Sequence, residues 1–177
     1  MGADEIKNWT DIAAVSAGSI HTVGLRKDGT VVATGRIGGL EVKVDGWTDI
    51  VAIAAGGSCT VGLMRDGTAV STGSSFSGDQ DISDWTDITA ITAGGNIVAG
   101  LKKDGTIAIA PGAPTECKII TAGWTDIVAI AAGNCWLAAL RADGTVLTTN
   151  TGMLDTDEYG VVRGGWAVDF GESIPTQ

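Results

Sequence analysis

Short apolar runs follow one another along the chain, separated by glycines and by Asp-Gly pairs. Residues 21–35 show the pattern: HTVGLRK is followed by Asp28-Gly29 and then by TVVATG. Runs of this length that are rich in β-branched residues predict strands. An Asp-Gly pair between two such runs predicts a tight hairpin, in which both turn residues take positive φ.

This pattern recurs four times. The ten residues WTDIVAIAAG occur twice, letter for letter, at 47–56 and 124–133, and near copies begin at Trp9 and Trp85. A fixed period of this length indicates an array whose units stack, because one unit cannot bury its apolar face alone. We therefore expect a single repeat domain over 1–177. Its units are 9–46, 47–84, 85–123 and 124–165, with 1–8 and 166–177 as partial closing strands.

Each unit carries the signals of four short strands and leaves no room for a helix. A small, β-branched first strand such as IVAIAAG precedes the Asp-Gly hairpin, and alanine and glycine in it suit a crowded axis. A fourth, weaker strand is expected at 41–44, 81–83, 118–121 and 161–163. The prediction is an all-β fold: a β-propeller of four repeats of about 38 residues, each a four-stranded blade. A β-helix is the alternative, but it would not need a hairpin in every unit.

The repeated residues resemble the repeat of a known family. The string W-T-D-I-x-A-I-x-A-G, followed by His-Thr, Gly-Leu, Asp-Gly-Thr-Val and Thr-Gly, resembles the repeat of the regulator of chromosome condensation family. It is most similar to bacterial members, which include the propeller-type β-lactamase inhibitory protein. The resemblance covers residues 9 to about 165 and implies a β-propeller.

The number of units departs from that family. Its members usually close seven blades on one chain, whereas this chain has four units. An open half-ring would leave strand edges and an inner face unpaired. We expect a homodimer in which two half-rings close into an eight-bladed ring. A compact four-bladed ring and a fragment of a longer ring are the alternatives.

Charge narrows the classes of partner. The formal net charge of −10 repels phosphate backbones and anionic lipid headgroups, so we expect neither nucleic acid nor a membrane as partner. The chain has no apolar run of about 18 residues and no visible secretion signal, and its compartment is left open. Three cysteines are an odd number at low density, which predicts free thiols.

Two segments differ between the units: the residues after the first-strand glycine, such as 19–21, and those after the third strand, at 36–41, 74–81, 112–117 and 151–160. Both are expected at one rim, because the loops that join strands one to two and three to four lie at the same end of a blade. Variable loops on a rigid scaffold are typical of a binding surface, and exposed Trp, Tyr and Met are frequent anchors. Trp136, out of register with the other tryptophans, could instead fill space in the fourth blade. We predict eight partner-binding residues: His21, Ile37, Cys59, Phe76, Ile97, Trp136, Met153 and Tyr159.

No catalytic residue, metal site or cofactor is predicted. His21 and Cys59 occupy equivalent positions in neighbouring units, so an imidazole and a thiol could meet, but no orienting group is evident. The cysteines lack C-x-x-C spacing, and the acidic loop at 155–158 lacks the glycine of a calcium motif. The aspartate of each W-T-D segment is expected to accept backbone N–H bonds with its carboxylate.

These observations predict a non-catalytic propeller that binds another protein through variable loops on one face. The resemblance implies one form of this function, inhibition of an enzyme by covering its active site. The alternatives are a lectin-like propeller that binds carbohydrate or small molecules, an excised or designed fragment without its own activity, and nucleotide exchange on a small GTPase, as in the eukaryotic branch of the family.

Overall fold

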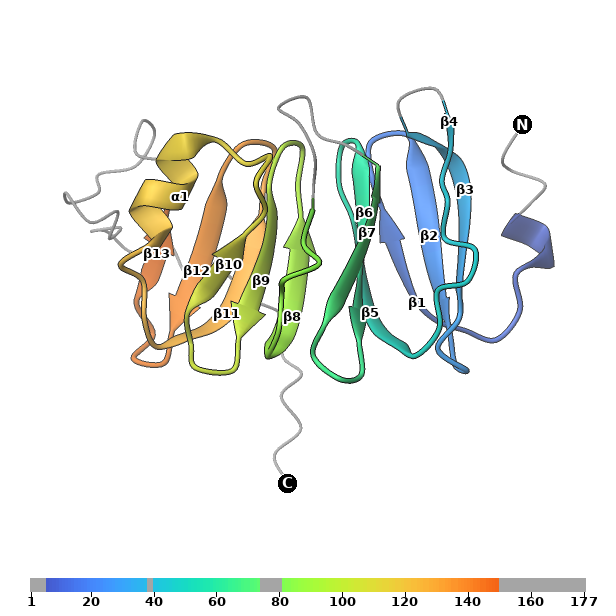
Figure 1. Ribbon diagram of the computed structural model, residues 1–177. Helices are drawn as coiled ribbons and strands as arrows, with labels where there is room; N and C mark the ends of the chain where they lie inside the picture. Colours follow the sequence, from blue (N-terminus) through green and yellow to red (C-terminus); the bar gives the residue numbers. More distant parts are fainter. Residues whose placement is uncertain (1–5, 38–39, 74–80, 150–177) are drawn as a thin grey trace.

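The computed structural model describes residues 6–37, 40–73 and 81–149. Four antiparallel sheets stand side by side in chain order, each formed by strands of one repeat (Figure 1). We call them blades 1 to 4. Blade 1 contains β1 (Ile12–Ala17), β2 (His21–Arg26), β3 (Val31–Ile37) and the two-residue β4 (Leu40–Glu41).

The other three blades have three strands each. Blade 2 contains β5 (Ile50–Ala55), β6 (Cys59–Met64) and β7 (Ala69–Gly73). Blade 3 contains β8 (Ile88–Ala93), β9 (Val98–Lys102) and β10 (Ile107–Ile109). Blade 4 contains β11 (Ile127–Ala132), β12 (Leu137–Arg141) and β13 (Val146–Thr148).

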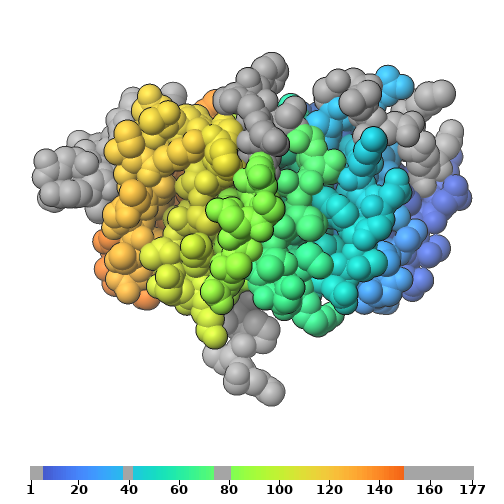
Figure 2. Space-filling view, in the orientation of Figure 1, coloured from blue at the N-terminus to red at the C-terminus, as the bar shows by residue number. Residues whose placement is uncertain are grey.

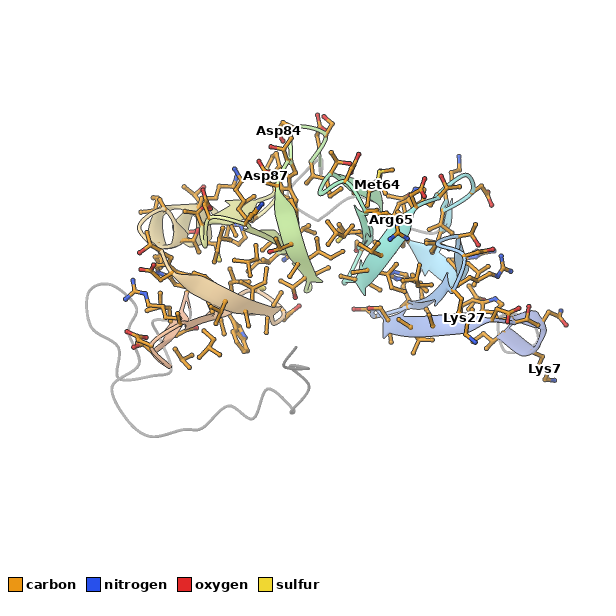
Figure 3. All side chains as sticks on the ribbon, turned by 90° about the horizontal axis from the view of Figure 1, so that it is seen from below. Lys7, Lys27, Met64, Arg65, Asp84 and Asp87 are labelled. Atoms are coloured by element: carbon orange, nitrogen blue, oxygen red, sulfur yellow. The ribbon has the colours of Figure 1, made fainter. Side chains whose placement is uncertain are left out.

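The blades form an open arc. The first strands of neighbouring blades contact one another along its inner side, while the later strands fan outwards (Figure 3). Neighbouring blades pack without a gap over the face seen in Figure 2. The all-β propeller architecture predicted from the sequence is therefore confirmed.

The predicted fourth strands are largely wrong. Among the described residues only blade 1 has one, β4, whereas residues 81 and 82 have no regular structure and Ser83 begins a turn. Residues 118–121 belong to a helix, α1 (Thr115–Thr121), which follows Pro114. Cys117 and Thr121 are buried four residues apart, the spacing of one helix face, and this outweighs the β-branched letters Ile-Ile-Thr. Residues 161–163 lie outside the described residues.

The described part of the N-terminal segment differs from the expected closing strand. Residues Ile6–Asn8 form a short 3-10 helix, and 166–177 lie outside the described residues.

The Asp-Gly hairpins are confirmed, with a different turn from the one expected. Gly29 has φ 83°, but Asp28 does not have positive φ. The Asp28 carboxylate instead accepts hydrogen bonds from the backbone N–H and the hydroxyl of Thr30, at 2.9 and 2.7 Å. The same bonds recur in the other blades, which explains why threonine follows every Asp-Gly pair. These bonds lower the pKa of each turn aspartate.

The aspartate of each W-T-D segment also acts differently from the expectation. Asp11, Asp49, Asp87 and Asp126 are left-handed, with φ between 56° and 59°. Their backbone carbonyls, not their carboxylates, accept the recurrent bond, as from Lys27 N–H to Asp11 O at 2.9 Å. Aspartate tolerates this backbone better than most residues with a Cβ, so it recurs for its conformation.

The core lies between blades rather than inside them. We call the contact between neighbouring blades a seam, and each of the three seams holds one buried cluster. At the seam of blades 1 and 2, Val23 and Leu25 of β2 pack with Ile50 of β5. In blades 1 to 3, the tryptophan that begins the unit packs on the second strand of its own blade, and the Trp47 ring would lie 2.9 Å from a Cβ added at Gly62. Glycine there makes room for the indole.

Candidate functional site

The two variable segments do meet at one end of the blades. In blade 1, Arg36 N–H donates to Ile20 O at 3.2 Å, which ties the end of β3 to the β1–β2 loop. In blade 4, Thr149 N–H, directly after β13, donates to the O atom of Leu137, the first residue of β12, at 2.9 Å. We call this end the variable rim. The opposite end, the constant rim, carries the four Asp-Gly-Thr turns and the W-T-D segments (seen from below in Figure 3).

Four of the eight predicted partner contacts are buried. His21, Cys59 and Ile97 are at most 4% exposed, and Ile37 is 7% exposed. The first three lie in the same strand position and face the next blade, on the side of β2 that also carries Val23. The next blade covers these three side chains. Their burial and that of Ile37 do not favour contact with a partner, and that contact stays a prediction.

Trp136 differs from its three equivalents. It is 41% exposed, and its indole lies against Gly133 at the start of its own loop. The reason is position: Trp136 belongs to blade 4, and the described residues include no fifth blade to cover it. The remaining predicted contacts, Phe76, Met153 and Tyr159, lie outside the described residues.

The His21 and Cys59 pair is not arranged as a nucleophile and its base. His21 Nε2 lies 2.8 Å from the Thr60 hydroxyl oxygen, and burial lowers the pKa of the imidazole. Burial raises the pKa of the Cys59 thiol to about 11, so the thiol is protonated at neutral pH. A reactive cysteine needs the opposite shift. His21 therefore belongs to the seam of blades 1 and 2, and Cys59 to the seam of blades 2 and 3.

The other cysteines are free thiols as well. Cys117 lies on the buried face of α1 and donates to the Thr149 hydroxyl at 3.2 Å, and burial raises the pKa of its thiol. Cys135 is exposed on the variable rim. Over residues 6–37, 40–73 and 81–149, no three His, Cys, Asp or Glu side chains gather into a potential metal site, and no helix is long and apolar enough to cross a membrane. The acidic loop at 155–158 is outside these ranges.

Sequence reasoning missed two exposed apolar side chains of the variable rim. Ile20 is 61% exposed in the β1–β2 loop, and Ile119 is 70% exposed on α1. A signal for Ile20 existed: His21, Val23 and Leu25 alternate on the buried face of β2, which turns residue 20 outwards. Ile119 was hidden by the mistaken strand at 118–121.

Comparisons with known proteins support the fold. No family model and no curated protein matches the chain. Three similar solved structures are the ectodomain of the receptor kinase CR4 from Physcomitrella patens (21% identity, TM-score 0.60), the ectodomain of ACR4 from Arabidopsis thaliana (19%, 0.57) and yeast RCC1 (Prp20) bound to Kap60 (17%, 0.59). Each match covers 77% of this chain but only 38%, 50% and 43% of the other chain, respectively. The chain thus has an RCC1-like β-propeller fold and spans half or less of these structures.

Proposed function

We propose that this chain is a non-catalytic propeller that binds another protein through its variable rim. The observation that supports this is the contrast between the two rims of one scaffold. The constant rim has the same turn and the same hydrogen bonds in all four blades. The variable rim changes from blade to blade, and in blade 3 it carries a helix with Ile119 exposed on it.

The fold of the similar structures is compatible with this role. Yeast RCC1 was solved bound to a protein, Kap60. A lectin-like function would favour similar pockets in every blade, but the equivalent residues His21, Cys59, Ile97 and Trp136 are unlike and three of them are buried. Enzyme inhibition is a narrower form of the proposal and rests on the resemblance of the repeat to the β-lactamase inhibitory protein.

A pair of photo-crosslinking variants tests the binding surface. One places a photoreactive side chain at Ile119 on the variable rim, and its control places it at Thr86, which is exposed on the constant rim. We expect the position 119 variant to capture one protein repeatedly, and the position 86 variant not to capture it. Equal capture from both positions would contradict the proposal.

Alanine variants then measure the energetics with the captured protein. Ile119→Ala, Phe76→Ala and Tyr159→Ala should each weaken binding by more than about 1 kcal/mol if these side chains are anchors. Thr86→Ala is the matched control, for which we expect no loss. Losses near zero at all three rim positions would rule out the variable rim as the binding surface.

Enzyme inhibition has its own test. If the captured protein is an enzyme, or a class A β-lactamase is used as the probe, inhibition should be competitive with substrate. Ile119→Ala should weaken the inhibition while Thr86→Ala leaves it unchanged. Binding without any effect on turnover would leave protein binding and remove the inhibitor role.

A further inference from the structure

Blade 1 exposes a face that the other blades bury. The residue three positions before the tryptophan that begins a unit is buried ahead of units 2, 3 and 4: Val44 is 5% exposed, Ile82 2% and Thr121 4%. Their equivalent before blade 1, Ile6, is 43% exposed. Val15 of β1 is 68% exposed, whereas its equivalents in the other first strands are half-buried.

Blade 1 also carries a groove of about 780 Å³, whose lining includes Trp9, Val32 and Thr34. In blade 2, the residues equivalent to Trp9 and Val32 are Trp47 and Val70, and they pack against blade 1. The groove is therefore the place that a preceding blade would occupy. We call this surface, with Ile6 and Val15, the blade-1 end face.

Blade 4 exposes the opposite half of the same contact. Leu140 is half-buried, while its equivalents Leu25, Leu63 and Leu101 are at most 6% exposed. Trp136 is 41% exposed, while its equivalents are at most 4% exposed. We call Trp136, Ala138 and Leu140 the blade-4 end face.

Backbone groups repeat this contrast. At the constant rim of every seam, an isoleucine N–H donates to the turn glycine of the preceding blade, as from Ile50 to Gly29 O at 3.0 Å. At the variable rim, the loop of one blade donates to the glycine of the next, as from Ser19 N–H to Gly56 O at 3.2 Å. Among the described residues, the equivalent groups of the two end faces lack these bonds: Ile12 N–H, Gly18 O, Asn134 N–H and Gly144 O.

We infer that a second copy of this chain covers both end faces, so that blade 4 of each copy packs on blade 1 of the other. The two faces are the two halves of a contact that the chain already makes three times, and each supplies the donors or acceptors that the other lacks. Blades 1 and 4 stand at the two ends of the open arc (Figure 3). Two arcs related by a two-fold axis then close into a ring of eight blades, whereas a non-closing contact would produce a filament.

Side-chain chemistry at the seams agrees with this pairing. At each seam, the first residue pair of the two facing second strands meets across the seam. At the seam of blades 1 and 2 this pair is His21 and Thr60, which are both polar and are hydrogen-bonded at 2.8 Å. In the next two seams the pairs are Cys59 with Val98 and Ile97 with Leu137, all apolar and buried in shared clusters. At the inferred seam, Trp136 meets Thr22 of the second copy, so the indole N–H faces a hydroxyl acceptor.

A cysteine trap tests this register. Across the seam of blades 3 and 4, Asn96 Nδ2 lies 3.8 Å from Cys135 Sγ. Ile20 in blade 1 is equivalent to Asn96 in blade 3 and to Cys135 in blade 4. In the inferred ring, blade 1 of the second copy follows blade 4, so Ile20→Cys places a thiol opposite Cys135 of the second copy. Under mild oxidation, we expect this variant to run at twice the 17.9 kDa of one chain on a non-reducing gel. Ile20→Cys combined with Cys135→Ser, and Ile119→Cys as an exposed control, should stay at the mass of one chain.

Light scattering on the unchanged full chain provides the second readout. We expect twice the mass of one chain, and monomers for Val15→Glu and Trp136→Glu, which each place a charge on one end face. Mixing these two variants should restore part of the dimer, because one of the two seams in the mixed dimer is then unaltered. Ile119→Glu is the matched control and should remain dimeric.

A monomer of the unchanged chain at every concentration would overturn the inference, and so would an untrapped Ile20→Cys variant. Dimers that dissociate with Val15→Glu but not with Trp136→Glu would also overturn it, because they would join blade 1 to blade 1. Circular dichroism on each variant shows that a lost dimer is not a lost fold. The rim experiments are independent of these results, since Ile119 lies on neither end face.

Discussion

The interior seams and the two end faces contain nearly the same residue types, but a neighbouring blade covers them only at the seams. Ile50, Ile88 and Ile127 are at most 4% exposed, while Ile12, at the same place in blade 1, is only half-buried. The first strand of blade 1 is the most exposed of the four first strands. Burial in this fold is thus decided by the presence of a neighbouring blade, and not by the residue type.

This difference indicates that the contacts between blades, at the seams, supply most of the stability of the chain. Every buried cluster joins two blades, and the hydrogen bonds at both rims cross from one blade to the next. A blade at the end of the array has half of these contacts, as expected where each unit interacts with its neighbours only. Substitutions at equivalent positions should therefore have unequal effects.

The largest effect is expected at a buried tryptophan. Trp85 is 5% exposed and packs at the seam of blades 2 and 3. Trp85→Ala should lower the free energy of unfolding by about 3–5 kcal/mol, because it leaves a large cavity. Trp9→Ala, in the more open blade 1, should cost less in urea denaturation of the dilute chain. Equal losses in the monomer would contradict the comparison.

The next effect concerns the glycines of the variable rim. A methyl group at Gly56 would meet the backbone oxygen of Gly94 in the next blade, so Gly56→Ala should lower stability by about 2–3 kcal/mol. At Gly133 the methyl would meet only the half-exposed ring of Trp136, which can turn away. Gly133→Ala should therefore cost less than about 1 kcal/mol in thermal unfolding of the monomer. A larger loss for Gly133→Ala than for Gly56→Ala would refute the assignment of these neighbours.

A smaller effect separates conformation from charge at the constant rim. Asp49 has φ 56°, so Asp49→Val should destabilise the chain by about 1–2 kcal/mol. Asp49→Asn and Asp49→Gly should be close to neutral in urea denaturation, because both residues accept this backbone. A loss for Asp49→Asn as large as that for Asp49→Val would mean that the carboxylate itself is needed.

The smallest effect is a pH dependence at one seam. Burial lowers the pKa of His21 below 6.5, and Nδ1 has no hydrogen-bond partner among the described residues. The unfolded chain therefore binds more protons as the pH falls below 6.5, and stability is lost in that direction. One proton contributes at most about 1.4 kcal/mol per pH unit.

The control for this pH dependence replaces the polar pair at the seam of blades 1 and 2 by the apolar pair found at the seam of blades 2 and 3. His21→Cys with Thr60→Val reproduces the apolar pair Cys59 and Val98. Urea denaturation between pH 7.5 and 5 should show a smaller pH slope for the double variant than for the unchanged chain. An identical slope would exclude His21 as its source.

The sequence predicted the parts of this fold that repeat. Four Asp-Gly hairpins and four small first strands were readable because local turn chemistry and β-branched runs act within a few residues. The helix α1 was not, because it depends on the burial of Cys117 and Thr121 against other strands. Only one fourth strand formed among the described residues, for the same reason: isolated runs of three or four residues do not determine a strand.

The candidate site was harder to predict than the fold. The two variable segments were correctly placed at one rim, but His21, Cys59 and Ile97 were assigned to the surface although they face the next blade. Variation between units indicates either a surface or a seam whose two sides vary together. The pair of His21 with Thr60 shows the second case.

The most direct test of the account is hydrogen exchange at one amide. Ile50, Ile88 and Ile127 N–H groups each donate to the glycine of the preceding blade, at 2.9 to 3.0 Å, whereas Ile12 N–H has no such bond among the described residues. In the inferred ring, Gly144 of the second copy would supply the acceptor. We predict that in concentrated protein the Ile12 amide exchanges as slowly as the other three, and that dilution or Trp136→Glu speeds up Ile12 alone. Fast exchange at Ile12 at every concentration, with the other three protected, would contradict the closed ring.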